Sequence, residues 1–183
     1  MVKEVVRTCT SSQLTRPYPP LDKTASWAPV EPWKRLLVDF GELDTRTFFD
    51  IFDAGTGYVI AHWTNGPKTS EAIRVLRTAF RVHGLCSTVV SDNGPAFAAL
   101  DFDAFLRDRG IEPLKSAPFC PSSNGPGEMG VKLLKLHYRR PSPAKDGLVD
   151  AAANINLVPR SDGYSPTARL MGRQWGGPKK RKV

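Results

Sequence analysis

The chain has 183 residues, of which 40% are hydrophobic and 24% are charged, so it can bury the core of one domain and is not disordered by composition. Its 26 Lys and Arg against 18 Asp and Glu give a net charge of +8, which favours a polyanionic partner such as nucleic acid or an acidic membrane face. Four of those charges lie in Lys179, Lys180, Arg181 and Lys182, so the remaining +4 makes a weaker case for a basic DNA-binding surface. The sequence has no run of 18 apolar residues and no signal-peptide core, so we expect a protein without a membrane partner.

The sequence pattern changes at Trp33. Residues 1–32 contain five prolines and no apolar periodicity, so we expect an extended leader there. From Trp33 onward, short β-branched and aromatic runs separated by Gly and Asp predict three antiparallel strands. These strands are predicted over residues 36–38, 47–52 and 58–63.

Helices and strands alternate over the rest of the chain. Apolar residues spaced three and four apart predict a helix over 68–83, which opens at Thr69 or Ser70 and ends at Gly84. Further strands are predicted over 88–90 and 112–116, and further helices over 96–109, 128–140 and 147–156, with a last short helix opened by Tyr164-Ser165-Pro166. This order predicts an α/β fold in which a mixed five-stranded sheet is flanked by helices.

Three carboxylates stand where strands or helices meet loops. Asp39 ends the first apolar run, Asp92 ends the run before a Gly-containing turn, and Glu128 begins a helix after a Pro/Ser/Gly loop. An acid at such a place is held rigidly and still reaches solvent. Three acids without a nearby set of Cys or His suit Mg²⁺ or Mn²⁺ rather than zinc.

Each of these acids also has an ordinary structural explanation. An Asp before Asn-Gly is most often a turn former whose side chain bonds its own backbone, which fits Asp92. Glu128 fits a first-turn acid stabilised by the helix dipole, and Asp39 fits an ion-pair partner at a strand end. The combination of the three, rather than any one of them, favours a metal site.

The segments around the acids resemble the catalytic core of retroviral and gypsy-like LTR-retrotransposon integrases. That family carries an Asp on its first strand, a second Asp in a DNG turn and a Glu 35 intervening residues later. Here Asp92 stands in SDNGPAF, Glu128 ends SAPFCPSSNGPGE, and 35 residues separate the two. The segments WKRLLVDF, FDIFDAGTGYVIAHW, which contains Asp53, and RSDGYSPTARLMGR resemble further family segments, so the resemblance spans about residues 5–173.

The resemblance implies an RNase H-like fold and a polynucleotidyl transferase that trims and joins DNA 3′ ends. Asp39, Asp92 and Glu128 would then hold two Mg²⁺ or Mn²⁺ ions roughly 4 Å apart, one at the attacking oxygen and one at the leaving 3′ oxygen. The family contacts DNA through lysines four and seven residues after its Glu, which implies that role for Lys132 and Lys135. On a helical wheel these lysines share a face with Glu128, although a solvated lysine pair gives the same pattern.

Other positions extend or limit this interpretation. Asn124, beside Gly125 in the loop before Glu128, suggests a segment that closes over DNA, with a plain connector as the alternative. Cys9 resembles one ligand of the zinc domain that precedes the family's core, but Ser12 replaces the second cysteine and no histidines lie upstream, so we expect no zinc. DNA at the element ends and in the target, and further copies of the chain, are the partners that the resemblance implies.

The predicted organisation is a catalytic core without the flanking domains of complete family members. We expect the leader over 1–32 to be the remnant of the end of a zinc-binding domain, the core over 33–140, a C-terminal helical part over 141–174 and a basic tail over 175–183. The tail contains PKKRKV, which resembles a nuclear localisation signal, whether native or appended, and predicts a nuclear rather than cytoplasmic location.

Three functions fit these observations. The first is integrase-like 3′-end processing and strand transfer of retroelement DNA. The second is a catalytically inactive, domesticated domain that binds DNA or chromatin, favoured by the missing flanking domains. The third is a nuclease or transposase of the same fold with another substrate, for which the sequence gives no specific support.

Overall fold

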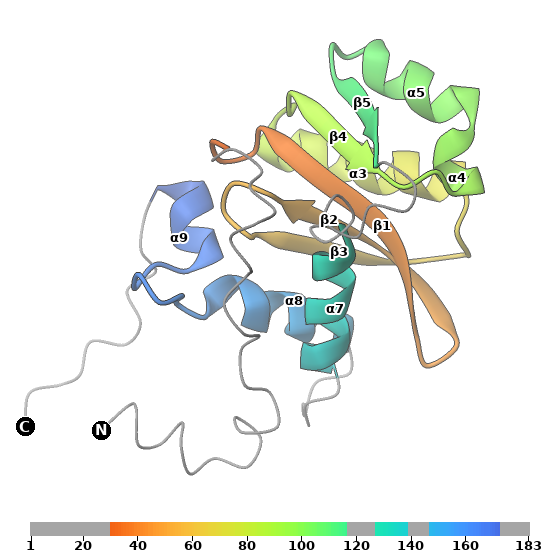
Figure 1. Cartoon of the computed structure of the whole chain (residues 1–183). Helices are drawn as coiled ribbons and strands as arrows, with labels where there is room; N and C mark the ends of the chain where they lie inside the picture. Colours follow the sequence, from red (N-terminus) through yellow and green to blue (C-terminus); the bar gives the residue numbers. More distant parts are fainter. Residues whose placement is uncertain (1–29, 117–126, 139–146, 173–183) are drawn as a thin grey trace, which may run out of the picture.

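A computed structural model describes residues 30–116, 127–138 and 147–172 (Figure 1). The strands are β1 (Arg35–Leu43), β2 (Arg46–Asp53), β3 (Val59–Thr64), β4 (Thr88–Ser91) and β5 (Glu112–Lys115). The helices are α3 (Thr69–His83), α4 (Pro95–Ala98), α5 (Leu100–Arg107), α7 (Gly127–Tyr138), α8 (Gly147–Leu157) and α9 (Pro166–Met171). Each described helix is too short or too polar to cross a membrane.

The strands form one five-stranded mixed sheet in the order β3-β2-β1-β4-β5. The first three strands pair antiparallel, and β4 and β5 join them in parallel. Parallel neighbours need a crossover: α3 returns the chain from β3 to β4, which lies beside β1, and α4 and α5 connect β4 to β5. The predicted α/β fold with a mixed five-stranded sheet is therefore confirmed.

Helices cover both faces of the sheet, and each face has its own core. Side chains alternate along a strand, so Leu36 and Val38 of β1 enter one core and Leu37 and Leu43 enter the other. The first core lies under α3 and α5, and the second lies under α7 and α8 (Figure 1). Burial of apolar side chains on both faces explains why β1 and β2 are almost continuously hydrophobic.

One predicted helix was wrong in its extent. The helix predicted over 96–109 is broken at Ala99, whose ψ of 136° is extended, and this gives α4 and α5. On one straight helix Phe97 and Phe102 would point about 140° apart, whereas the break lets both rings enter the first core with their centroids 5.2 Å apart. The helix predicted to open at Thr69 or Ser70 does begin at Thr69, after the N-cap residue Lys68, and the Thr69 hydroxyl donates to the Ala96 carbonyl 2.8 Å away.

The C-terminal helices belong to the same body as the sheet. Leu148, Ala151 and Ile155 of α8 lie in the second core. Asn156 of the same helix is buried and bonds both backbone groups of Val59 on the edge strand β3, donating to its carbonyl at 2.7 Å and accepting from its N–H at 2.8 Å. The amide thereby completes the hydrogen bonding of the sheet edge that lies below α8.

Candidate active site

Asp39 and Asp92 each lie two residues beyond the last pair of neighbouring strands β1 and β4. The β1–β4 ladder runs in parallel as far as the pair Leu37 and Val90, and both of these residues lie in the second core. Extending that register by two residues brings Asp39 level with Asp92, on the α7 side of the sheet. The ladder stops before this level, so the two acids stand where β1 and β4 separate.

The prediction that Asp39 ends its strand was wrong. β1 continues to Leu43, because beyond Asp39 it remains paired with β2 in a long hairpin. Only the edge of β1 that faces β4 has no paired strand at this point, since β4 ends at Ser91. The acid is thus fixed by a ladder on one side and open on the other, which is a firmer support than a strand end.

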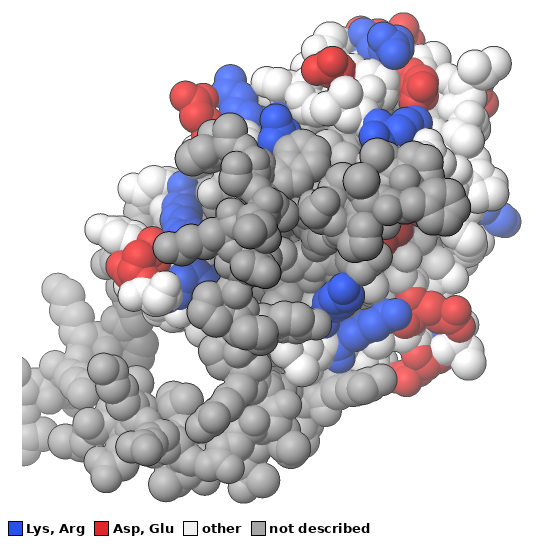
Figure 2. Space-filling view, viewed as in Figure 1, with Lys and Arg blue, Asp and Glu red and all other residues white. Residues whose placement is uncertain are grey.

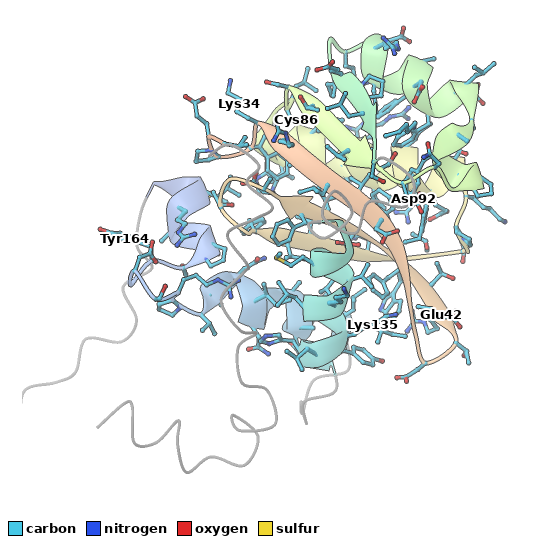
Figure 3. The ribbon with its side chains drawn as sticks, viewed as in Figure 1. Lys34, Glu42, Cys86, Asp92, Lys135 and Tyr164 are labelled. Atoms are coloured by element: carbon cyan, nitrogen blue, oxygen red, sulfur yellow. The ribbon has the colours of Figure 1, made fainter. Side chains whose placement is uncertain are left out.

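The turn that carries Asp92 is tied down by its neighbours. The Asp92 carboxylate accepts the Gly94 N–H at 2.9 Å, which is the turn-forming bond expected of an Asp before Asn-Gly. Asn93 donates to the Ser116 carbonyl at 3.2 Å, and Lys115 donates to the Phe97 carbonyl at 2.6 Å. Asp92 is exposed, and Figure 3 shows it just past the end of β4. One oxygen therefore orients the side chain, and the described residues offer no hydrogen bond to the other.

The third acid lies at the start of α7. Glu128 is in the first turn of that helix, while its side chain lies outside the described residues. Two residues later Gly130 packs directly on Asp50 and Phe52 of β2, where an added Cβ would overlap the Asp50 carboxyl. Asp50 is the partner of Asp39 in the β1–β2 register. The first turn of α7 therefore lies over the strand pair that carries Asp39.

Asp50 is a fourth acid at this place, and the sequence reasoning missed it. It is completely buried, and neither carboxyl oxygen has a hydrogen-bond partner in the described structure. Burial, reinforced by the nearby Asp39 carboxylate, raises the pKa of Asp50 well above its ordinary value. The signal in the sequence was an Asp in the middle of the apolar run FFDIF, where a buried strand has no routine use for an acid.

By contrast, Asp53 on the same strand is a structural acid. Its carboxylate accepts the backbone N–H groups of Trp33 and Gly55 at 3.2 Å and the Thr56 hydroxyl at 2.6 Å. These bonds join the start of the sheet to the β2–β3 turn. The side chain is buried and its oxygens are used by the fold.

The predicted lysines lie on α7 beyond Glu128. Lys132 is exposed, Lys135 is half-buried (Figure 3), and Leu134 between them is completely buried in the second core. The helix thus turns an apolar side to the sheet and keeps both lysines off it. Asn124, the loop around it and the tail residues Lys179, Lys180, Arg181 and Lys182 lie outside the described residues.

Charge on the visible face is mixed. Figure 2 shows Lys and Arg side chains in small groups between acidic ones, rather than gathered on one basic surface. This agrees with the modest charge that remains once the basic tail is set aside.

The donor set fits a hard divalent cation. Asp39 and Asp92 offer carboxylate oxygens, with Glu128 a few residues from the point where α7 meets β2. Among the side chains that the structure describes, no three His, Cys, Asp or Glu groups form a cluster that could hold a metal ion, and the Glu128 side chain is not one of these. Magnesium commonly binds one or two carboxylates and completes its coordination shell with water and substrate phosphate, so Asp39 and Asp92 could supply the protein ligands of such an ion.

Sheet order and helical layers are those of an RNase H-like fold. Solved structures share this fold. One is the catalytic core domain of bovine immunodeficiency virus (BIV) integrase, which is 17% identical, with a TM-score of 0.66 over 76% of this chain and 95% of that one. Another is a simian T-cell lymphotropic virus intasome in complex with the PP2A regulatory subunit B56 gamma, which is 20% identical, with a TM-score of 0.71 over 99% of this chain and 68% of that one. The predicted RNase H-like fold is thereby confirmed.

The chain also has relatives in sequence. The chain is 32% identical over 136 residues to an uncharacterised Caenorhabditis elegans protein, 28% identical over 187 residues to the Pro-Pol polyprotein of simian foamy virus type 3, and 37% identical over 103 residues to the transposase InsD of Escherichia coli insertion element IS2. These matches cover 73%, 93% and 51% of this chain but only 11%, 16% and 34% of the relatives. No family model matches. The chain therefore has the fold of a retroviral integrase catalytic core and relatives among Pol polyproteins and transposases.

Proposed function

We propose that the chain is the catalytic core of a divalent-metal-dependent polynucleotidyl transferase that acts on DNA, with integrase-like 3′-end processing and strand transfer as its reactions. The observation that carries the proposal is the parallel register of β1 and β4, which, extended by two residues, brings Asp39 level with Asp92, while the first turn of α7 lies over β1 and β2. The relatives support it, since they are Pol polyproteins and a transposase.

In this proposal the three acids hold the cation and the DNA phosphate in one geometry. Two Mg²⁺ or Mn²⁺ ions, when bound, would supply charge stabilisation at the attacking and leaving oxygens of an in-line phosphoryl displacement. Asp39 is oriented by the Phe40 N–H, which donates to it at 2.7 Å, and Asp92 by the Gly94 N–H. Because backbone groups hold both carboxylates, little side-chain freedom is lost when the substrate binds.

We further propose that Lys132 and Lys135 bind the phosphates of the DNA end. They lie one and two turns after Glu128 on α7, so a strand whose scissile phosphate reaches the acids would continue along them. Replacing either lysine by Ala should weaken binding to all sequences alike and reduce the salt slope of log affinity by about 1. Lys34, which is exposed at the start of β1, is the matched control, because its removal subtracts the same charge elsewhere.

The decisive experiment compares Asp39→Asn and Asp92→Asn with Asp101→Asn, an exposed acid on α5. Each variant keeps the size of its side chain and loses one charge. With Mn²⁺ and a DNA duplex, nicking or joining should fall by at least about 100-fold in the first two variants and be unchanged in the third. Equal activity in all three would refute the proposal.

The same assay tests the inactive alternative. A wild-type chain that binds DNA but neither nicks nor joins it, with Mg²⁺ or with Mn²⁺, would point to a domesticated binding domain. Preferential cleavage of an RNA–DNA hybrid would point to a nuclease of this fold. Sedimentation of the chain with and without DNA would test the proposed assembly into oligomers.

A further inference from the structure

Asp50 has no role in the fold that the structure can account for. It sits on β2, the second strand of the sheet, paired with Asp39 on one side and Ala61 on the other. It is completely buried, and both carboxyl oxygens lack a hydrogen-bond partner in the described structure. Buried polar groups in native proteins almost always have partners, so this exception requires a reason.

The surroundings of Asp50 preserve space for its carboxyl group. Its neighbours along the same face of β2 are Phe48 and Phe52, and α7 lies above it. Gly130 of α7 comes so close that a Cβ there would overlap the Asp50 oxygen, and would also stand 3.3 Å from the Phe52 Cβ. A glycine inside a helix costs stability, and here it makes room for an acid that costs stability as well.

The strand shows what a structural acid looks like in this protein. Asp53, three residues further on, is equally buried and satisfies its carboxylate with backbone N–H groups and a hydroxyl. Among the described residues Asp50 has only its own backbone N–H nearby, and this lowers its pKa less than burial raises it. Its direct cross-strand neighbour is another acid, Asp39, and two carboxylates placed opposite each other repel until a proton or a cation compensates them.

We propose that Asp50 is a positioning residue of the divalent-cation site, a fourth carboxyl group that strengthens binding of the cation held at Asp39. This inference rests on the proposed function, because it takes Asp39 and Asp92 as the metal ligands. Asp50 lies directly across from Asp39 on the same face of the sheet and under the first turn of α7, so its carboxyl group adjoins the ligand that would hold the cation. Supporting groups behind a metal ligand fix its orientation and raise its affinity.

Metal binding without DNA tests this directly, because it needs no catalytic turnover. Titration of the full chain with Mn²⁺, followed by electron paramagnetic resonance of the free ion, gives the affinity and the number of sites. We expect Asp50→Asn to weaken Mn²⁺ binding by about 10-fold to 100-fold. Asp92→Asn should weaken it too, whereas Asp101→Asn, with the same change of charge on an exposed helix, should leave it unchanged.

A purely structural Asp50 would behave differently. Its replacement by Asn or by Val would shift the urea midpoint of the metal-free protein and leave the Mn²⁺ affinity as it was. The Asp50→Val variant, which places an apolar side chain among apolar neighbours, guards against failure of the Asn variant to fold. If Asp50 instead supports the cation site, as proposed, the rise in melting temperature that Mn²⁺ produces in the wild type should be smaller in both the Asn and the Val variant.

The outcomes separate the two proposals. Loss of Mn²⁺ binding in Asp92→Asn together with unchanged binding in the folded Asp50 variants would overturn this inference and leave the proposed function standing. A wild-type chain that binds no Mn²⁺, or binding that is unchanged in both Asp92→Asn and Asp39→Asn, would overturn the proposed function and this inference with it. Weakened binding in the Asp50 variants, with the Asp101 control unaffected, supports both.

Discussion

Replacing Gly130 by Ala tests the contact that connects α7 to the candidate site. On an exposed helix this change stabilises a protein by about 1 kcal/mol, since Ala has the better helix propensity. In this protein the new Cβ would overlap the Asp50 carboxyl and would stand 3.3 Å from the Phe52 Cβ. Either α7 moves away from the sheet or the acid must leave its place.

The size of the effect follows from these two opposing contributions. Forcing a methyl group into a packed core costs about 1–3 kcal/mol, so the net change in the free energy of unfolding should lie between about zero and a loss of 2 kcal/mol. With the Asp50 side chain shortened to Ala, the overlap disappears and only the Phe52 contact remains. In that background Gly130→Ala should stabilise by up to about 1 kcal/mol.

Urea denaturation of the wild type, both single variants and the double variant gives the coupling energy. We expect about 1–3 kcal/mol, with the second substitution relieving the first. Asp50→Asn is the matched control: the amide occupies the same space as the carboxyl, so Gly130→Ala should remain unfavourable beside it. That control separates the effect of shape from the effect of charge.

One result would refute this reasoning. If Gly130→Ala stabilises the wild type as much as it stabilises the Asp50→Ala protein, the carboxyl does not lie under Gly130. The placement of the first turn of α7 over β2, and with it the position of Glu128, would then be wrong.

Further predictions concern the fold around the site. Burial raises the pKa of the Cys86 thiol from 9.0 to about 12. The stability that the protonated thiol contributes should therefore be complete below pH 9.0 and be lost as the pH rises toward 12. Over that range the urea midpoint of the wild type should fall relative to the midpoint of Cys86→Val. Asn156→Ala removes both partners of the Val59 backbone and should cost about 2–4 kcal/mol in urea denaturation. Asp53→Ala removes the acceptor of the Trp33 N–H and of the Thr56 hydroxyl and should lower the free energy of unfolding by about 3 kcal/mol. Asp53→Asn keeps one acceptor oxygen and should lower it by less.

Local pattern was enough to predict most of the secondary structure. The strands, the helix that ends at Gly84 and the late helix that opens at Ser165 all follow from short-range periodicity and terminal residues. Gly84 has a φ of 84°, which a residue with a side chain rarely adopts, so it ends α3 where the sequence places it. The break at Ala99 was beyond such reasoning, because it is imposed by the packing of Phe97 against Phe102 rather than by any helix-breaking residue.

The candidate site was predictable for a different reason. The spacing of Asp92 and Glu128 and the sequence around them resemble a family, and this resemblance pointed to residues that no propensity could single out. What it could not supply is the partner of Asp39. The cross-strand neighbour depends on the length of the turn between β1 and β2: Leu43 pairs with Arg46, and that register alone sets Asp39 opposite Asp50.

That register also explains why the acid pair is confined to one level of the sheet. Shifting β2 by one residue along β1 would turn Asp50, Phe48 and Phe52 toward the first core, and would bring an apolar side chain opposite Asp39. Because the same slip would move Phe49 and Ile51 out of the first core, the packing of both cores holds the register firmly. The hydrophobic packing of the sheet therefore keeps two acids opposite each other at the place where β1 and β4 separate. In the metal-free protein the raised pKa of Asp50 already relieves the repulsion between the two acids, and a divalent cation bound at Asp39 would compensate it further.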